Sequence, residues 1–245
     1  MEKTLNNTLM NNPSIRRLIE TFAFFKANVF LIGKFLIIST LPLILLEIFL
    51  SYYGTTVSFP ITIRYLSIII GYLYQPIYTG GLIYLIYKIV LDEQCNIREC
   101  LSVSLLRWAD LIIVNIISTV IIIAGLLAFI IPGFIAFARL SLAEYSVIIT
   151  TCNPKKAIMN SNDLAKQFTW QIIGSCFLLS GILLIIELLI QIIVNKLSIG
   201  NIFISAVSSL ISIILWSNFT ILLFRYYDLA SKNNEPQLED NPANS

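Results

Sequence analysis

The stretch that decides the fold is LIIVNIISTVIIIAGLLAFIIPG, residues 111–133. Residues 111–131 carry no charge, and a helix needs about 20 such apolar residues to cross the hydrocarbon core of a bilayer. Hydrocarbon offers no water to the backbone, so we expect this run to close its own hydrogen bonds as an α-helix. The run is continuously apolar, whereas the strands of a membrane β-barrel alternate, so we favour helices.

The composition of the whole chain supports a membrane protein. Of the 245 residues, 57% are hydrophobic and 12% are charged, against about 25% charged in a typical soluble domain. Histidine is absent, which excludes His-based acid–base catalysis, His-activated nucleophiles and His-containing metal sites. The net charge of +2 is too small to indicate a nucleic-acid partner. The four cysteines form no C-x-x-C pair, so we expect reduced thiols and neither a metal site nor a cofactor.

Five further apolar runs flank the central one, which predicts an all-α protein with six transmembrane helices. The fourth run is the weakest because Arg139 and Glu144 lie within it, and a full-length span and a re-entrant helix both stay open there. The predicted spans are 35–53, 65–87, 111–131, 134–151, 172–195 and 201–224.

The distribution of basic residues predicts the topology, because cytoplasmic loops carry an excess of Lys and Arg. With both termini in the cytoplasm, thirteen basic residues lie inside and two lie outside, with Arg139 in the membrane. Removing the fourth span would move three lysines outside, so six spans are favoured. The inside set is Lys3, Arg16, Arg17, Lys26, Lys34, Lys88, Arg98, Arg107, Lys155, Lys156, Lys166, Arg225 and Lys232, and the outside set is Arg64 and Lys196.

Three segments on the predicted cytoplasmic side read as amphipathic helices lying on the membrane surface. They are Pro13–Phe30, a segment that starts at Asn96 with a capping-box Glu99, and Pro154–Phe168. They could contact a cytosolic partner, but contact with anionic lipid headgroups is favoured. We expect a single membrane domain over residues 13–230, with disordered polar ends at 1–12 and 231–245.

Four ionisable residues lie within the predicted spans, where burying a charged side chain in hydrocarbon is unfavourable in free energy. Glu47, Arg139 and Glu187 have similar predicted depths below the outer face, so opposite charges could pair across helices. Glu144 lies nearer the middle and points away from Arg139, and its charge state stays open. These residues could form a proton or ion pathway; a structural ion pair beside a protonated glutamate is the favoured alternative.

Residues that suit close helix packing lie in the second span and at the third-to-fourth turn. A proline kink followed by two glycines lets neighbouring helices approach closely. The candidates are Pro76, Gly80, Gly81, Pro132 and Gly133.

Several short pieces, in order and spacing, resemble the YciC-type family of uncharacterised bacterial inner-membrane proteins over about Phe24–Leu229. They are Gly80-Gly81-Leu82-Ile83, Ile131-Pro132-Gly133-Phe134-Ile135, Ala157-Ile158-Met159-Asn160-Ser161, Phe168-Thr169-Trp170 and Leu223-Phe224-Arg225-Tyr226-Tyr227. The grouping is distantly similar to the membrane domain fused to some glycerophosphodiester phosphodiesterases. The resemblance implies a six-helix protein of a bacterial inner membrane and supplies no established activity, and no enzymatic function is carried over from the phosphodiesterases. Glu144 and Arg139 depart from the family pattern, which commonly has a proline and an apolar residue there.

The sequence therefore favours a non-enzymatic component of membrane homeostasis, or a scaffold, that contacts lipid, a membrane-protein partner or a second copy of itself. The alternative is a small transporter or channel that uses the intramembrane carboxylates. A membrane enzyme is the third option, and no His or carboxylate–metal motif supports it.

Overall fold

The computed structural model describes residues 12–56, 60–196 and 202–234, and the regular structure in these ranges is entirely helical. Within them, six segments are long and apolar enough to cross a membrane, which confirms the predicted fold class and identifies a multi-pass membrane protein. The predicted disorder of residues 1–11 and 235–245 lies outside the described residues. The six segments are Pro13–Leu50, Tyr65–Val90, Trp108–Ala128, Ile130–Ile149, Pro154–Val194 and Val207–Asn233.

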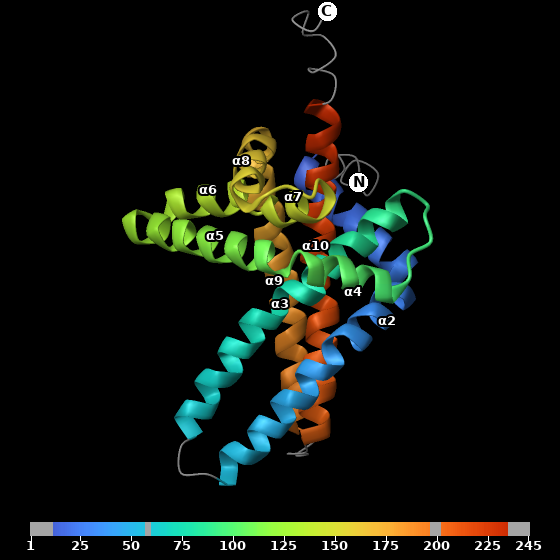
Figure 1. Cartoon of the computed structure of the whole chain (residues 1–245), viewed down its shortest axis with the longest axis vertical. Helices are drawn as coiled ribbons and strands as arrows, with labels where there is room; N and C mark the ends of the chain where they lie inside the picture. Colours follow the sequence, from blue (N-terminus) through green and yellow to red (C-terminus); the bar gives the residue numbers. More distant parts are fainter. Residues whose placement is uncertain (1–11, 57–59, 197–201, 235–245) are drawn as a thin grey trace, which may run out of the picture. The chain divides into compact units, whose positions relative to one another are not determined.

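The helices divide between two compact units. Unit 1 comprises residues 1–27, 109–179 and 218–245, and unit 2 comprises residues 28–108 and 180–217. In chain order the helices are α2 (Pro13–Thr56), α3 (Pro60–Val90), α4 (Ile97–Leu106), α5 (Trp108–Ala128), α6 (Ile130–Leu140), α7 (Ala143–Ile149), α8 (Pro154–Ala165), the 3₁₀ turn η1 (Lys166–Phe168), α9 (Thr169–Lys196) and α10 (Ile202–Asn234) (Figure 1).

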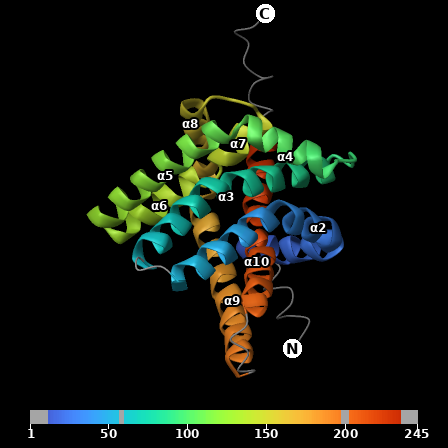
Figure 2. The same ribbon diagram turned by 60° about the horizontal axis from the view of Figure 1, so that its bottom comes forward.

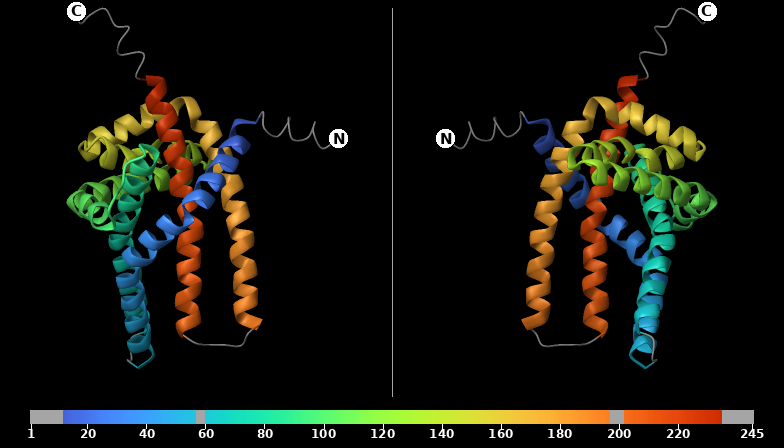
Figure 3. Two further views of the ribbon diagram at one scale, coloured as in Figure 1. Left: turned by 90° about the vertical axis from the view of Figure 1, so that its right-hand side faces the viewer. Right: turned by 90° about the vertical axis from the view of Figure 1, so that its left-hand side faces the viewer.

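In unit 2, α4 packs antiparallel along the C-terminal half of α3 (Figure 2). The hydroxyl of Ser104 donates to the carbonyls of Pro76 and Ile77 at 2.9 and 2.6 Å, and Trp108 Nε1 donates to the Leu73 carbonyl at 2.8 Å. The same unit holds the 180–196 part of α9 beside the 202–217 part of α10 (Figure 3). The apolar core of unit 2 includes Ile32, Phe35, Leu36, Leu82, Ile83, Leu85, Ile86 and Leu183.

In unit 1, α5 and α6 form a helical hairpin and run side by side (Figures 1 and 2). The chain turns at Phe129, whose backbone is extended at φ −161° and ψ 150°. The sequence predicts that the third span runs to Ile131 and stops at Pro132, and this is wrong: Pro132 lies in the first turn of α6. A helix leaves the N–H groups of its first turn unbonded, so a proline is tolerated there and can mark a start.

The predicted fourth span is two helices, α6 and α7, separated at Ser141 and Leu142. Ser161 of α8 closes this break: its hydroxyl donates to the Arg139 carbonyl at 2.6 Å and accepts the Leu142 N–H at 3.1 Å. A backbone group without a hydrogen-bond partner in an apolar setting costs several kcal/mol. Because the Ser161 hydroxyl acts as both donor and acceptor, it satisfies the free carbonyl and the free N–H at the break. The fourth segment is therefore an interrupted span.

Aromatic residues of α7, α10 and η1 form the core of unit 1. Tyr145 stacks on Tyr227 with ring centroids 5.8 Å apart, and Phe168 packs against Tyr226 at 6.2 Å. The Tyr145 hydroxyl donates to the Thr220 carbonyl at 2.9 Å, so this buried tyrosine joins α7 to α10 by both its ring and its polar tip.

Two of the three segments predicted as surface helices, α4 and α8, are separate short helices, while Pro13–Phe30 is not. That segment is the first part of α2, which runs without a break from Pro13 to Thr56, because a single Gly33 does not end a helix that is apolar on both sides. Asn96 caps α4 as predicted, accepting the Arg98 N–H at 3.4 Å, while Glu99 accepts the Tyr84 hydroxyl at 2.8 Å. At the other end α10 continues to Asn234, into the segment predicted as a disordered tail.

Candidate functional site

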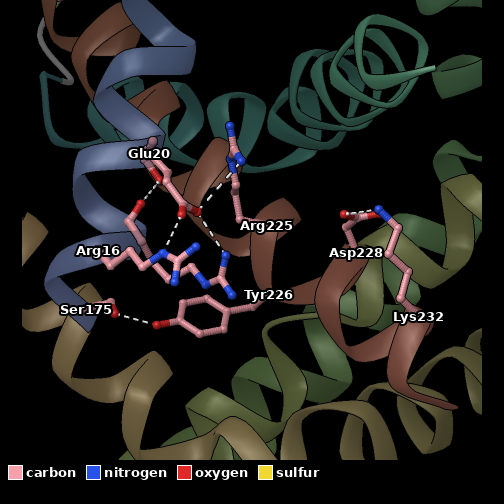
Figure 4. A network of polar contacts seen from close by, with 9 residues as sticks. Arg16, Glu20, Ser175, Arg225, Tyr226, Asp228 and Lys232 are labelled. Atoms are coloured by element: carbon pink, nitrogen blue, oxygen red, sulfur yellow. Dashed lines mark hydrogen bonds and ion pairs between the residues drawn. The ribbon is translucent and has the colours of Figure 1, made fainter. Parts of the chain in front are cut away.

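Three arginines of unit 1 converge on one carboxylate (Figure 4). Arg16 Nε lies 3.0 Å from Glu20 Oε1, and Arg17 Nη1 lies 2.9 Å from Glu20 Oε2. From α10, Arg225 Nη1 lies 3.8 Å from the same Oε2 atom. We call these four residues the arginine cluster.

The first turns of α2 set the geometry of the cluster. Asn12 accepts the Ser14 N–H at 3.0 Å and so caps the helix, and Pro13 occupies its first position. Arg16 and Arg17 then stand four and three residues before Glu20, which are the two spacings that bring side chains together on one helical face.

Arg225 reaches the cluster from α10, and its guanidinium carbon lies 5.4 Å from the centre of the Phe24 ring. An aromatic face attracts a cation and orients the planar guanidinium above it. The contact therefore fixes Arg225 against α2 without using any of its N–H donors.

Hydrogen bonds around Tyr226 join the helix ends that carry the cluster. The buried Tyr226 hydroxyl lies 2.6 Å from Ser175 Oγ and 3.2 Å from the Gln171 carbonyl, both on α9. Ser14 of α2 reaches the same Gln171 carbonyl at 3.4 Å. The beginnings of α2 and α9 and the end of α10 therefore meet at one place in unit 1.

The charges of the arginine cluster do not cancel. Three guanidinium groups face one carboxylate, which leaves a net charge of +2 (three minus one). The side chains of Arg17 and Arg225 keep 22% and 32% of their exposure, so both are partly desolvated yet reachable. A guanidinium has five N–H donors in a planar fork that matches phosphate, so the cluster has donors to spare for an anion.

The four predicted intramembrane charges divide between the units. Arg139 and Glu144 belong to unit 1, and Glu47 and Glu187 belong to unit 2. The predicted pairing of Arg139 with Glu47 or Glu187 stays a prediction.

Arg139 and Glu144 each contact an asparagine. Arg139 Nη1 donates to Asn162 Oδ1 at 3.3 Å, and the Arg139 Nε atom is buried without a hydrogen-bond partner among the described residues. The Glu144 carboxyl is hydrogen-bonded by Asn115 of α5. Sequence analysis missed both asparagines, because they lie on other helices and no pattern links them to these charges.

The two carboxylates of unit 2 have different surroundings. Glu187 accepts hydrogen bonds from Ser212 Oγ at 3.3 Å and from Trp216 Nε1 at 3.2 Å, so its two oxygens bind two donors on α10. Glu47 lies on the exposed side of α2.

Two of the residues predicted to pack helices, Gly81 and Gly133, lie at close approaches. A Cβ on Gly81 would lie 2.7 Å from Phe35 Cζ, and a Cβ on Gly133 would lie 2.4 Å from the Leu126 side chain. Gly80 and Pro76 are buried in α3, while Pro132 is exposed at the start of α6.

Among the described residues, no group of three or more Cys, Asp or Glu side chains could hold a metal ion. The arginine cluster is a different kind of arrangement, in which three cationic side chains surround one carboxylate.

No family model, curated protein or solved structure matches the chain. The site therefore has to be interpreted from its own geometry. Sequence analysis assigned Arg16, Arg17 and Arg225 to one predicted face of the membrane and did not place them together. Arg17 and Arg16 lie three and four residues before Glu20, and this spacing could have predicted the part of the cluster that lies on α2.

Proposed function

We propose that this multi-pass membrane protein is a non-enzymatic component of membrane homeostasis in a bacterial inner membrane, and that its arginine cluster binds the phosphate of anionic phospholipids. The observation that carries the proposal is the convergence of Arg16, Arg17 and Arg225 on the single carboxylate of Glu20. The resemblance to YciC-type proteins supports the bacterial inner membrane.

A lipid headgroup suits this site better than a soluble anion. The cluster lies at the ends of long apolar helices, where phosphates of a bilayer would stand beside it at high local concentration. Anionic leaflets attract basic residues by about 1 kcal/mol each. Further lysines of the same unit, Lys155, Lys156 and Lys166, add positive charge on and after α8.

The topology that we propose places both ends of the described chain in the cytoplasm. The contact of Arg225 with Glu20 supports this, because it brings the start of α2 to the end of α10. The excess of basic residues on that face supports the cytoplasmic side.

The proposal is tested by measuring which lipids stay bound to the purified protein in native mass spectrometry. We expect wild type to retain phosphatidylglycerol or cardiolipin over phosphatidylcholine, and each of Arg17→Gln and Arg225→Gln to lower the retained fraction by about fivefold. Arg225→Lys separates charge from shape: it keeps the cation and loses the forked donors, so we expect an intermediate loss.

Lys232→Gln is the matched control, because Lys232 lies on the same helix and pairs with Asp228 at 2.8 Å. We expect this variant to retain lipid as wild type does. Equal retention by wild type, Arg17→Gln and Arg225→Gln would refute the proposed site. Co-purification of a protein partner that these two variants lose, without any loss of lipid, would replace it with a protein-binding scaffold.

A second candidate function is transport through the intramembrane charges. It is favoured by the Arg139 Nε atom, which is buried without a hydrogen-bond partner among the described residues, and by the polar pair of Glu144 and Asn115 in the same unit. This function requires ion flux in proteoliposomes that Glu144→Gln abolishes and that Glu93→Gln, on an exposed loop, leaves intact. Absence of flux in wild type contradicts it.

A further inference from the structure

Two cysteines of unit 2 lie against each other at the corner between α3 and α4. The Sγ atoms of Cys95 and Cys100 are 2.7 Å apart, although both are free thiols. A disulfide bond is about 2.05 Å long, so a small movement of one side chain brings the two sulfurs within bonding distance.

The local fold holds the two thiols in this arrangement. After α3, the chain reverses at Asp92, which has a φ of 55°, and Lys88 pairs with Glu93 across the turn. Asn96 then starts α4, and the Cys100 N–H closes its first turn onto the Asn96 carbonyl at 3.1 Å. Cys95 therefore immediately precedes the helix cap, and Cys100 points back toward it from the first turn.

The surroundings fix Cys100 more tightly than Cys95. Cys100 is completely buried, and its carbonyl lies 3.2 Å from the position that a Cβ on Gly81 of α3 would take. Cys95 is half-exposed on the connecting loop. An oxidant therefore reaches Cys95 first, and Cys100 stands ready as the second thiol.

We propose that Cys95 and Cys100 form a reversible disulfide, which makes the α3–α4 corner a site of thiol oxidation. The oxidant is a hydroperoxide. The Cys95 thiolate attacks its terminal oxygen, the O–O bond breaks, and water or an alcohol leaves as Cys95 becomes a sulfenic acid. Cys100 sulfur then attacks Cys95 sulfur, the S–O bond breaks, and the hydroxyl leaves as water with the Cys100 proton. The two thiols lose two electrons in total, which the peroxide gains.

A metal site explains the geometry less well. Two cysteines on one tetrahedral zinc have sulfurs about 3.8 Å apart, given Zn–S bonds of about 2.3 Å. The observed 2.7 Å is shorter, and the described residues around the pair hold no further set of ligands for a metal. The thiols are therefore placed for bonding to each other.

The disulfide would join the α3–α4 loop covalently to the first turn of α4, at a corner that is otherwise held by polar contacts. The Tyr84–Glu99 hydrogen bond of 2.8 Å and the Lys88–Glu93 ion pair join this corner to α3. In the proposed topology the corner faces the reducing cytosol, so the pair is a dithiol at rest and closes during oxidative stress.

The test is peptide mass spectrometry of the purified full-length protein with and without hydrogen peroxide, after acid quenching and alkylation. Trypsin cleaves after Arg98, between the two cysteines, so the disulfide joins two peptides that separate on reduction. We expect peroxide to produce this linked pair with the loss of two hydrogens, and dithiothreitol to restore both alkylated peptides.

The other cysteines supply the controls. Cys152→Ser is expected to form the linked pair as wild type does, and Cys100→Ser to leave Cys95 as a sulfenic acid that a dimedone probe traps. If Cys100→Ser impairs folding because it buries a hydroxyl, Cys95→Ser serves in its place. Cys95→Ser keeps the buried Cys100 and also removes the linked pair. Alkylation of Cys95 and Cys100 after peroxide to the same extent as Cys152, or a cross-link between two chains, overturns the proposal.

Discussion

The Ser161 hydroxyl accepts the Leu142 N–H at 3.1 Å and thereby stabilises the start of α7. Its proton goes to the Arg139 carbonyl at 2.6 Å, so one side chain of α8 serves both sides of the interruption between α6 and α7. The interruption is therefore a built feature of the fourth segment, and it places Arg139 and Glu144 on two different helices.

Ser161→Ala should destabilise the protein because it leaves two buried backbone groups without their partner. We expect a loss of about 1–3 kcal/mol in the free energy of unfolding, measured by denaturant unfolding in detergent. Ser102→Ala is the matched control, since that exposed hydroxyl bonds only locally to the Glu99 carbonyl at 2.8 Å. Similar stability of the two variants would show that the break does not depend on Ser161.

Gly133→Ala tests the close approach in the α5–α6 hairpin. The new Cβ would lie 2.8 Å from the Leu126 backbone nitrogen as well as against its side chain, so backbone must move. We expect a loss of about 1–3 kcal/mol, read as a lower melting temperature. Gly71→Ala meets nothing within 4 Å and should be neutral or slightly stabilising. The reverse order of the two melting temperatures contradicts the hairpin geometry.

Glu20→Gln separates a lipid site from a purely structural ion network. The change removes the shared carboxylate, so the net charge of the arginine cluster rises from +2 to +3 (three minus none). Retention of anionic lipid should rise by about fivefold, although the melting temperature without lipid should fall. A variant that loses both stability and lipid retention would indicate that the arginines serve the fold alone.

The reactivity of Cys95 should depend on pH more strongly than that of a free thiol. Burial raises the pKa of Cys95, and Glu99 raises it further, whereas the contacts with Cys100 and Lys88 lower it, with a net upward shift. The thiolate is the reactive form, so peptide-resolved alkylation of Cys95 should still accelerate at pH values where a free cysteine, with a pKa of about 8.5, approaches its plateau. A plateau at or below the pH at which free cysteine reaches its own would contradict the raised pKa. The titratable groups that act on Cys95 are Cys100, Glu99 and Lys88; Tyr84 and Glu93 contact Glu99 and Lys88 in turn.

The existence of the six apolar segments could be predicted because each has a local cause in a run of mostly apolar residues, with at most two charges in any predicted span. Whether Pro132 ends one helix or begins the next could not be predicted from the sequence. A proline just after a helix and a proline in the first turn of the following helix give the same local sequence pattern. The turn at Phe129 is fixed by the approach of Gly125 to Gly133, where a Cβ on Gly125 would lie 3.0 Å from the Gly133 Cα.

The candidate site was less predictable than the fold because its partners are distant in sequence. Glu20 meets Arg225 from the other end of the chain, and the break in the fourth segment depends on Ser161 of α8. The distribution of charge over the loops predicted that the basic residues lie on one side of the membrane. It did not predict that three arginines contact the same carboxylate. The juxtaposition of Cys95 with Cys100 likewise requires the cap at Asn96 and the turn at Asp92.

The most direct test of the lipid-binding account is the melting temperature in a neutral detergent as phosphatidylglycerol is added, for wild type and the Arg17→Gln/Arg225→Gln double variant. A ligand that binds the folded state raises its stability in proportion to the logarithm of ligand concentration above Kd. We predict that wild type gains stability with phosphatidylglycerol and not with phosphatidylcholine, while the double variant gains with neither. An equal gain in the double variant would contradict the account.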